Sequence, residues 1–490
     1  MSRDLTVVVI GGGVAGISCV ESLFQEFENS TSHFKTVVLI SESTLVKRVT
    51  SHELRGHQLE WLNVEECQLE VAFSNKPEGL KLITIKGKVL KIIPSSRTLF
   101  YTTGTAVNSQ GYDVISLCTG SKPRQLSLRS ENLAEEITSK ILVIRDTSTV
   151  LELKHRLSLC RKIVIIGNGG IGLELVDKIA TCDKVWIIRD QSIGFTFFDS
   201  GAAKFLLDAR RTTEKIQSRP PKNQDHTSTI IDRPEPGRFG PSLGPDWASG
   251  IKLEGNSALA DHLDIIYNDE LENIDFDVDG SRLIVTTLSG KKVDCDLIVA
   301  AIGVVPDPPP VEGDSLLLCE QDRGVVIDEQ MRTSVPYIYA AGDVVSCDKW
   351  THSDLWFQMR LWVQARQMGH YAGKCIVEHL ANRDPSIYFN FDCFTHCTTF
   401  FGYKLILLGR YNLQHFAQDE SPKCEIIARV NPSKDYVKLI IKEGRIIGAV
   451  LVGESGLEET VENLIQDQID VSAYKDQILD GTVDIEDYFD

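Results

Sequence analysis

The chain has 490 residues, of which 42% are hydrophobic and 24% charged, which is typical of globular proteins and enough for about two to four domains. Its net charge of −18 argues against a nucleic-acid or anionic-membrane surface, because phosphates would be repelled. Residues 452–490 hold twelve acidic side chains and one lysine, so the exclusion is weaker for the rest of the chain.

Targeting signals are weak throughout the sequence. No apolar run approaches the length of about 18 residues that a membrane span needs, and the apolar run Leu5–Ile10 is too short for a signal peptide. The 12 cysteines include no C-x-x-C pair, which fits free thiols in a reducing compartment. We therefore expect a cytoplasmic protein, with the nucleus left open and no membrane partner.

The first forty residues predict a parallel βαβ unit. Thr6–Ile10 and Thr36–Ile40 are β-branched strands, and Ile17–Phe27 has a helical pattern. Between the first strand and the helix, Gly11 permits a tight turn, Gly13 lets the backbone approach a pyrophosphate, and Gly16 lets helix and strand pack closely. The helix N-terminus adds N–H groups and partial positive charge, so this G-x-G-x-x-G turn, with Val14 and Ala15, predicts a dinucleotide site.

The same order of signals returns about 155 residues later. Its segments are a strand at Lys162–Ile166, a turn containing Gly167, Gly169, Ile171 and Gly172, a helix at Leu173–Ile179, and a strand at Val185–Ile188. Two such turns indicate two dinucleotides. FAD and NAD(P)H are the economical pair, since a nicotinamide can pass hydride to a flavin held against it.

The later part of the chain begins with a proline-rich stretch. Six of the 17 prolines fall between Pro220 and Pro245, which predicts an extended insertion at about 212–254. Strands resume near Ile265. A hairpin over 436–452, a helix over 457–468 and an acidic tail close the chain.

Three further segments carry a family resemblance. Tyr112–Pro123, Asp296–Gly303 and Thr333–Val344 resemble, in order, motifs of the pyridine nucleotide-disulfide oxidoreductases, over about residues 5–385. The resemblance implies an α/β fold with two doubly wound, Rossmann-like dinucleotide-binding domains and a C-terminal α+β interface domain. The implied segments are FAD-binding 1–140, NAD(P)-binding 141–304 with the insertion, FAD-binding 305–388, and interface 389–490 with the acidic tail.

The resemblance also implies cofactor contacts. Asp343 would bond the ribityl chain of FAD, and Val89 would pair with its adenine. The remaining implied contacts are Thr119, Gly120 and Val344 for FAD, and Glu174 and Gly303 for NAD(P)H. The segments 196–199, 243–247, 358–362 and 484–490 resemble one eukaryotic branch of the family.

The sequence departs from the family in its cysteines. The stretch 41–51, where disulfide reductases carry a redox pair, holds no cysteine, so a flavin-proximal dithiol relay is not expected. Cys393 and Cys397 would lie about 13 Å apart in a strand, beyond disulfide reach. We interpret them as buried thiols. With His396 between them they make only a weak metal signal, and no metal is predicted.

Two features point to the flavin ring. Lys47 is a candidate for the lysine that related reductases keep near flavin N5, with a solvated surface lysine as the alternative. The segment Leu355–Gly373 has a long helical pattern. In the family its N-terminus faces the flavin pyrimidine, where the helix dipole stabilises negative charge.

The ribose positions at the ends of the second strands are irregular. In the first unit Ser41 takes the place of the usual acidic residue and Glu42 follows it. In the second unit Arg189, which favours NADPH, is followed by Asp190, which favours NADH. The nicotinamide preference stays open.

We expect an FAD-dependent oxidoreductase in which NAD(P)H reduces the flavin without a redox cysteine pair and without a catalytic acid or base. The acceptor stays open among oxygen, a quinone, a redox protein such as a ferredoxin, and an oxidised target, in a role in redox or oxidative-stress defence. The alternative is an NAD(P)H-dependent, redox-sensing partner of another protein that docks through the acidic tail or the insertion. Monomer and homodimer both fit.

Overall fold

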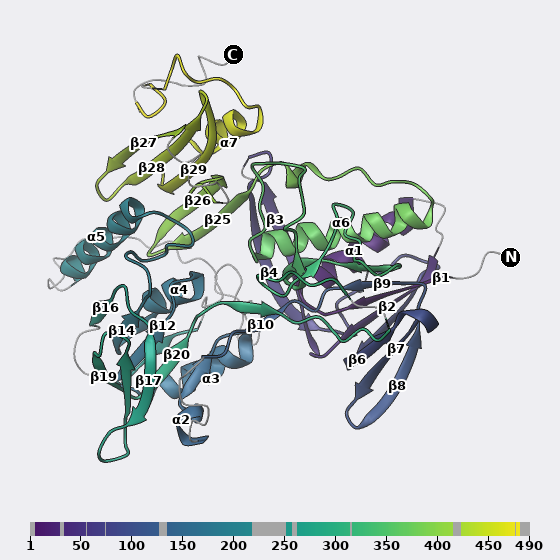
Figure 1. Ribbon diagram of the computed structural model, residues 1–490, viewed down its shortest axis with the longest axis horizontal. Coiled ribbons are helices and arrows are strands. Elements are labelled where there is room, and N and C mark those ends of the chain that lie inside the picture. The colour runs from purple at the N-terminus through teal and green to yellow at the C-terminus, as the bar shows by residue number, and fades with distance from the viewer. Residues whose placement is uncertain are drawn as a thin grey trace, which may run out of the picture. The chain divides into compact units, whose positions relative to one another are not determined.

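The computed structural model describes residues 5–29, 34–54, 56–73, 75–126, 135–217, 251–256, 262–313, 316–414, 423–475 and 477–480. The chain forms two units (Figure 1). The first comprises Met1–Leu54, Glu60–Lys122 and Val304–Phe394, and the second comprises Arg55–Leu59, Pro123–Gly303 and Thr395–Asp490. The chain leaves the first unit through β10 (Ser121–Pro123) and returns through β21 (Val304–Pro306).

The first unit is built on a five-stranded parallel sheet. Its order is β23 (Ile338–Ala340), β9 (Val114–Leu117), β1 (Leu5–Ile10), β2 (Phe34–Ser41), β5 (Lys81–Lys86). Val7, Val8 and Val9 are fully buried, as expected for a parallel strand covered on both faces. Helices α1 (Val14–Asn29) and α6 (Trp362–Leu380) pack side by side (Figure 1).

Smaller sheets complete this unit. They are the hairpin β3 (Leu45–Leu54) and β4 (Glu60–Gln68), the meander β6 (Lys88–Ile93), β7 (Thr98–Thr103) and β8 (Ala106–Gly111), and the pair β22 (Val325–Val326) and β24 (Val345–Ser346).

The second unit contains a second five-stranded parallel sheet. Its order is β11 (Ile141–Val143), β20 (Leu297–Ala300), β12 (Lys162–Ile166), β14 (Asp183–Ile187), β16 (Leu263–Ile266). Its helices are α2 (Glu135–Ser139), α3 (Thr147–Leu157), α4 (Gly170–Lys178) and α5 (Ser200–Gln217). Two small sheets accompany it, β13 (Ile179–Ala180) with β15 (Leu253–Glu254), and β17 (Leu271–Phe276) with β18 (Leu283–Thr287) and β19 (Lys292–Cys295).

The C-terminal part of this unit is antiparallel. Its sheet order is β25 (Thr395–Phe400), β26 (Tyr403–Gly409), β29 (Arg445–Gly453), β28 (Asp435–Lys442), β27 (Cys424–Asn431), followed by α7 (Glu458–Gln466). The predicted α/β fold, the β28–β29 hairpin and the helix after it are confirmed. Helix α5 continues through Gln217, into the stretch predicted as an insertion. Residues 218–250, Trp247 among them, and 481–490 of the acidic tail lie outside the described residues.

The predicted helix over 355–373 is wrong at its amino end, because α6 begins at Trp362. The residues before Trp362 form no helix, and their side chains bond the backbone of another segment. The Gln358 side chain accepts the Cys347 N–H (3.0 Å) and donates to the Val345 carbonyl (2.9 Å), and Arg360 Nε donates to the Asp343 carbonyl (2.9 Å). A helical pattern in sequence does not register such competing bonds.

The helices in the described ranges are each too short or too polar to span a bilayer.

A buried carboxylate fixes the segment between β3 and β4 to α7 in the second unit. Glu462 is fully buried and accepts the backbone N–H groups of His57 (3.2 Å), Gln58 (2.6 Å) and Leu59 (3.0 Å). A Cβ on Gly56 would lie 1.7 Å from Glu462 Oε2, so the carboxylate also requires glycine there. Burial raises the pKa of Glu462, and the three N–H groups oppose that rise.

Glu462→Gln is therefore expected to destabilise the protein. The amide offers one acceptor oxygen, and its NH₂ group would face N–H donors, costing about 2–3 kcal/mol of unfolding free energy. Urea unfolding measures this, with Glu459→Gln, an exposed position on the same helix, as control. Equal unfolding midpoints for the two variants would contradict the account.

Candidate functional site

The first glycine turn joins β1 to α1 through backbone contacts that only glycine allows. Gly11 has φ +122°, and a Cβ there would lie 2.0 Å from the carbonyl oxygen of Cys118. A Cβ on Gly16 would lie 1.9 Å from the carbonyl oxygen of Gly11. Any side chain at either position would push the helix away from the sheet.

Gly13 faces open space instead. A Cβ there would have no heavy atom within 4 Å. The first intrahelical bond runs from the Ile17 N–H to the Gly13 carbonyl (3.0 Å), so the N–H groups of the preceding turn, which includes the buried Val14 and Ala15, are not used within the helix. An open position beside a helix N-terminus fits a pyrophosphate.

The second glycine turn repeats this geometry between β12 and α4. Gly167 has φ +117°, and its Cβ would lie 2.1 Å from the Ala301 carbonyl oxygen. A Cβ on Gly172 would lie 2.7 Å from the Gly167 carbonyl oxygen, whereas one on Gly169 would meet nothing within 4 Å. The residues present therefore fit a dinucleotide at each turn. Ile171 and Glu174 both lie on α4, which begins at Gly170, so Ile171 belongs to the helix and not to the turn in which the sequence placed it.

Among the described glycines, Gly13 and Gly169 alone combine an ordinary φ with no neighbour within 4 Å of a Cβ. Every other described glycine either has a positive φ or would place a Cβ within 4 Å of a neighbouring atom. The two open positions lie at the same place in the two turns.

The ribose position of the first turn lies at the end of β2. Ser41 is buried, its hydroxyl donates to the Ser43 carbonyl (2.9 Å), and its Oγ lies 2.5 Å from where a Gly12 Cβ would be. Glu42 is exposed and pairs with Lys88 (3.4 Å). Ser41 is buried and carries a hydroxyl group, so the solvent-accessible carboxylate at this position is that of Glu42.

The ribose position of the second turn includes a residue that sequence reasoning missed. Asn168, between the first two glycines of the turn, donates through Nδ2 to Asp190 Oδ2 (2.8 Å) and to the Ser192 carbonyl (2.9 Å), and it accepts the Gly194 N–H (2.6 Å). Asp190 is thus oriented from inside the turn, while Arg189 is exposed. The sequence signal for this role was the amide side chain of Asn168 within an otherwise glycine-rich turn.

Asp343 lies beside the segment that follows β9. Ser121 Oγ, one residue after Gly120, donates to Asp343 Oδ2 (3.0 Å), and the Thr119 hydroxyl donates to the Asp307 carbonyl (2.8 Å). Burial raises the pKa of Asp343, while the Ser121 bond and the charges of Arg360 and Lys47 oppose the rise. Ser121 and Arg360 were not predicted.

Lys47 belongs to the same group of side chains. Its backbone N–H donates to the Gly12 carbonyl (3.0 Å), and its ammonium lies 4.7 Å from the ring centroid of Trp362, the first residue of α6. The fold brings together the glycine turn, the lysine, the helix N-terminus and Asp343.

The remaining predicted positions, Val89, Val344 and Gly303, lie on a strand, in a short turn and between two strands. Val89 lies on β6 and packs against the core of the first unit, and Val344 is buried in the short turn after Gly342. Gly303, two residues after Ala301, has φ +91°, and a Cβ there would meet nothing within 4 Å.

All twelve cysteines lie among the described residues and are free thiols. Cys393 and Cys397 are 2% and 6% exposed, which confirms their interpretation as buried thiols. Cys19 and Cys118 hydrogen-bond each other beneath the first turn, which lowers the pKa of Cys118 and raises that of Cys19, but both are at most 3% exposed. The described residues hold no cluster of three metal-ligating side chains.

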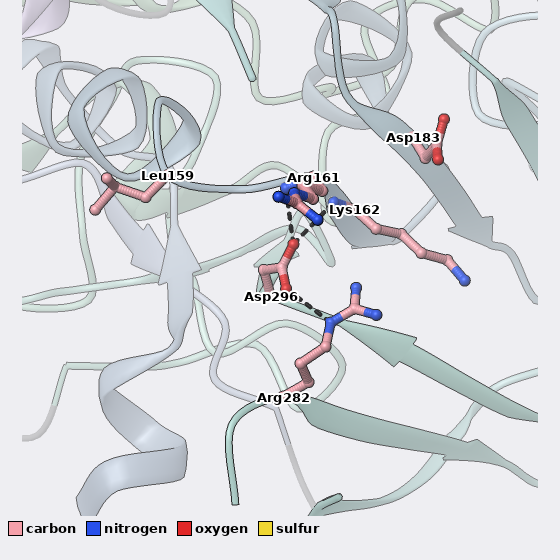
Figure 2. Close-up of a pocket in the computed structure, with 6 residues that line it drawn as sticks. All are labelled: Leu159, Arg161, Lys162, Asp183, Arg282 and Asp296. Carbon is pink, nitrogen blue, oxygen red and sulfur yellow. Dashed lines mark hydrogen bonds and ion pairs between the residues drawn. The ribbon is translucent and has the colours of Figure 1, made fainter. Parts of the chain in front are cut away.

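A pocket of about 380 Å³ lies at the other edge of the second parallel sheet (Figure 2). Lys162 and Asp183 begin β12 and β14, so the pocket faces the amino ends of the strands, whereas nucleotides bind at the carboxyl ends. Asp296 accepts the N–H groups of Arg161 (2.8 Å) and Lys162 (2.9 Å) and pairs with Arg282 (2.8 Å). We interpret this network as structural.

Comparisons with known proteins agree with this geometry. A family model described as pyridine nucleotide-disulphide oxidoreductase matches residues 5–223 and 256–369, and one described as rubredoxin NAD+ reductase C-terminal domain matches residues 401–469. Pyridine nucleotide-disulfide oxidoreductase domain-containing protein 1 of Mus musculus is 36% identical over 99% of this chain and 98% of its own length.

Solved structures share the fold. Putidaredoxin reductase in its covalent complex with putidaredoxin has a TM-score of 0.65 at 15% identity, covering 100% of this chain and 99% of that one. The NAD-dependent persulfide reductase of A. fulgidus has a TM-score of 0.65 at 17% identity, covering 96% and 79%.

Asp296→Asn tests the network in Figure 2 through acid unfolding. Burial alone would raise the pKa of Asp296, but the Lys162 and Arg161 N–H groups and Arg282 bring it below its ordinary 3.8. A lowered carboxylate pKa stabilises the fold above the unfolded value and loses that effect as the pH falls through the folded one. The variant should lose about 1–2 kcal/mol at pH 7, and the difference from the parent should shrink below pH 3.8.

Thermal unfolding across pH measures this effect. Asp279→Asn, at an exposed turn of the same unit, is the control. A difference between parent and Asp296→Asn that did not change with pH would show that the carboxylate charge is not what stabilises this edge.

Proposed function

Because the chain belongs to the pyridine nucleotide-disulphide oxidoreductase family, whose members bind FAD and NAD(P)H, we propose that it is an NAD(P)H-dependent flavoprotein oxidoreductase that does not use a cysteine pair of its own. FAD would bind at the first glycine turn and NAD(P)H at the second. The observation that carries this is the pair of open positions at Gly13 and Gly169, one in each turn. FAD held there would supply hydride acceptance from NAD(P)H and electron transfer to an acceptor.

The residues of the first unit have distinct parts in this proposal. The N–H groups at the start of α1 receive the FAD pyrophosphate, Glu42 the ribose, and Asp343 the ribityl chain, with Ser121 orienting the Asp343 carboxylate (3.0 Å). Lys47, near Asp343, and the N-terminus of α6 place positive charge where negative charge develops on reduction. In the second unit Arg189 is available to a 2′-phosphate and Asp190 to ribose hydroxyls, so both nicotinamide cofactors have a contact.

The acceptor lies outside the chain in this proposal. Cys19 and Cys118, the thiols beside the first turn, are too buried to exchange with an external disulfide. A redox protein is the acceptor class we favour over oxygen, quinones and oxidised targets, since the C-terminal sheet matches the rubredoxin NAD+ reductase model and putidaredoxin reductase is known in complex with putidaredoxin. We assign the activity to cellular redox or oxidative-stress defence.

A second candidate function is NAD(P)H-dependent binding of a protein partner with turnover incidental. The excess of acidic side chains over residues 452–490 favours it, because a local excess of negative charge suits a basic partner. It predicts that NAD(P)H changes partner capture in pull-downs even when flavin turnover is blocked.

Anaerobic mixing with NADH and with NADPH tests the leading proposal. The parent protein should copurify with flavin, and its flavin absorbance should bleach.

Gly13→Ala should fold but lose the flavin, because the methyl group takes the space of the pyrophosphate. Gly169→Ala should keep the flavin and need about 10–100-fold more NAD(P)H, a loss of roughly 1.4–2.7 kcal/mol of binding. Gly111→Ala, whose Cβ would lie 4.0 Å from Arg97 O, is the matched control. A parent protein without flavin, or a flavin that neither cofactor bleaches, would refute the proposal.

Lys47→Met tests the charge beside the flavin. Removing a cation that stabilises the reduced ring should lower the flavin reduction potential and slow reduction about tenfold, the effect of roughly 1.4 kcal/mol. Flavin content should stay unchanged. Stopped-flow reduction and dye-coupled potentiometry measure both effects, with Lys86→Met, exposed at the end of β5, as control. Potentials equal to the parent's would identify Lys47 as a surface lysine.

A further inference from the structure

The segment between β14 and α5, residues 188–199, is attached at both ends to other parts of the second unit. It contains Arg189 and Asp190 of the second ribose position, and it ends at Asp199. Its amino end is held by Asn168 of the glycine turn, which bonds Asp190, Ser192 and Gly194. We call this segment the 188–199 loop.

The middle of the loop packs against the glycine turn. The Gly194 carbonyl accepts the N–H groups of Phe197 (2.7 Å) and Phe198 (3.0 Å). The Phe197 ring lies 3.3 Å from where a Gly170 Cβ would be, so it fills the space above the first residue of α4. The Phe197 ring also meets two rings of β25, those of Phe400 (centroids 5.5 Å apart) and His396 (6.1 Å).

The carboxyl end of the loop is held by a charge pair with the C-terminal sheet. Lys438, on β28 and 5% exposed, places Nζ 2.6 Å from Asp199 Oδ2 and 2.7 Å from Asn412 Oδ1. The Tyr436 hydroxyl donates to Asp199 Oδ1 (3.0 Å), and the Tyr411 hydroxyl donates to the Thr196 carbonyl (2.9 Å). Asp199 also accepts the N–H groups of Gly201 (2.7 Å) and Ala202 (3.2 Å) at the start of α5.

Burial and the partner's charge act in opposite directions on the pKa of each member of this pair. Burial alone would raise the pKa of Asp199, but Lys438, the Ala202 N–H and Tyr436 lower it. Burial lowers the pKa of Lys438, and Asp199 opposes that fall. A buried lysine left without its carboxylate strongly destabilises the folded protein. The pair therefore fixes the loop to the sheet more firmly than either residue could alone.

Resting on the proposed function, we infer that Asp199 and Lys438 are positioning residues for the nicotinamide cofactor: the pair holds the 188–199 loop so that Arg189 and Asp190 face the ribose of NAD(P)H. Neither residue of the pair is assigned a contact with the cofactor. The C-terminal sheet therefore sets the affinity of the second turn, and the FAD turn in the other unit does not depend on the pair.

Asp199→Asn is the sharpest variant, because asparagine can keep Oδ1 as the acceptor for the α5 cap and for Tyr436. It replaces the carboxylate oxygen that faces Lys438 with an uncharged NH₂ group, which cannot accept from the ammonium. Calorimetric titration with NAD⁺ and with NADP⁺, together with steady-state kinetics, gives the readouts. We expect both dissociation constants and the KM for NAD(P)H to rise about tenfold, the equivalent of about 1.4 kcal/mol, while kcat at saturation and flavin content stay within about twofold.

Lys438→Met should raise the same constants, and the double variant should be no worse than the more damaging single one, because the two residues act as a pair. Lys404→Met is the matched control, since Lys404 lies in the same sheet and pairs with Glu454 and Glu458. If either charge variant fails to fold, Tyr436→Phe, which removes one hydrogen bond to Asp199, should still raise KM about threefold.

Unchanged dissociation constants in Asp199→Asn would overturn the inference, and so would equal losses in Lys404→Met. A loss of flavin together with nicotinamide affinity would also overturn it, because that result indicates general unfolding. If the parent protein itself bound neither NAD⁺ nor NADP⁺, the proposed function would fail, which this design separates from failure of the loop inference.

Discussion

The structure depends on one steric constraint that occurs twice, the approach of a helix to within contact of the strand end beside it. At Gly11 the limiting atom is the Cys118 carbonyl oxygen, and at Gly167 it is the Ala301 carbonyl oxygen. Each contact leaves no room for a Cβ, and each brings a helix N-terminus to the carboxyl edge of a parallel sheet. The open positions at Gly13 and Gly169 lie in these two turns, each beside a helix N-terminus, where the partial positive charge suits a phosphate.

Around the first turn, groups from distant parts of the sequence converge on one region. Lys47 bonds the turn through its backbone, its ammonium lies over Trp362, and it acts electrostatically on Asp343. Around the second turn, Asn168 bonds the amino end of the 188–199 loop, and the charge pair between Asp199 and Lys438 attaches its carboxyl end. The first turn thus lies among Lys47, Trp362 and Asp343, while the second turn is tied through the 188–199 loop to the antiparallel C-terminal sheet.

Local pattern was enough to predict the two turns, their strands and the C-terminal hairpin, because glycine spacing and β-branched runs record local sterics. Asn168, Ser121 and Arg360 were missed, since their roles arise from partners 17 to 222 residues away in the sequence. The start of α6 was misplaced because Gln358 and Arg360 bond the backbone of residues 343–347 instead of continuing a helix. Periodicity reports which residues are apolar, and it does not report which backbone groups are already engaged.

Under the proposed function, one chain holds two dinucleotides at separate, equivalent turns. Native mass spectrometry of the purified protein, alone and with added NADH, tests this most directly. The account predicts a mass increment of one FAD per chain, and a further increment of one NADH that leaves the FAD in place. Displacement of FAD by NADH, or binding of only one dinucleotide at any concentration, would contradict it.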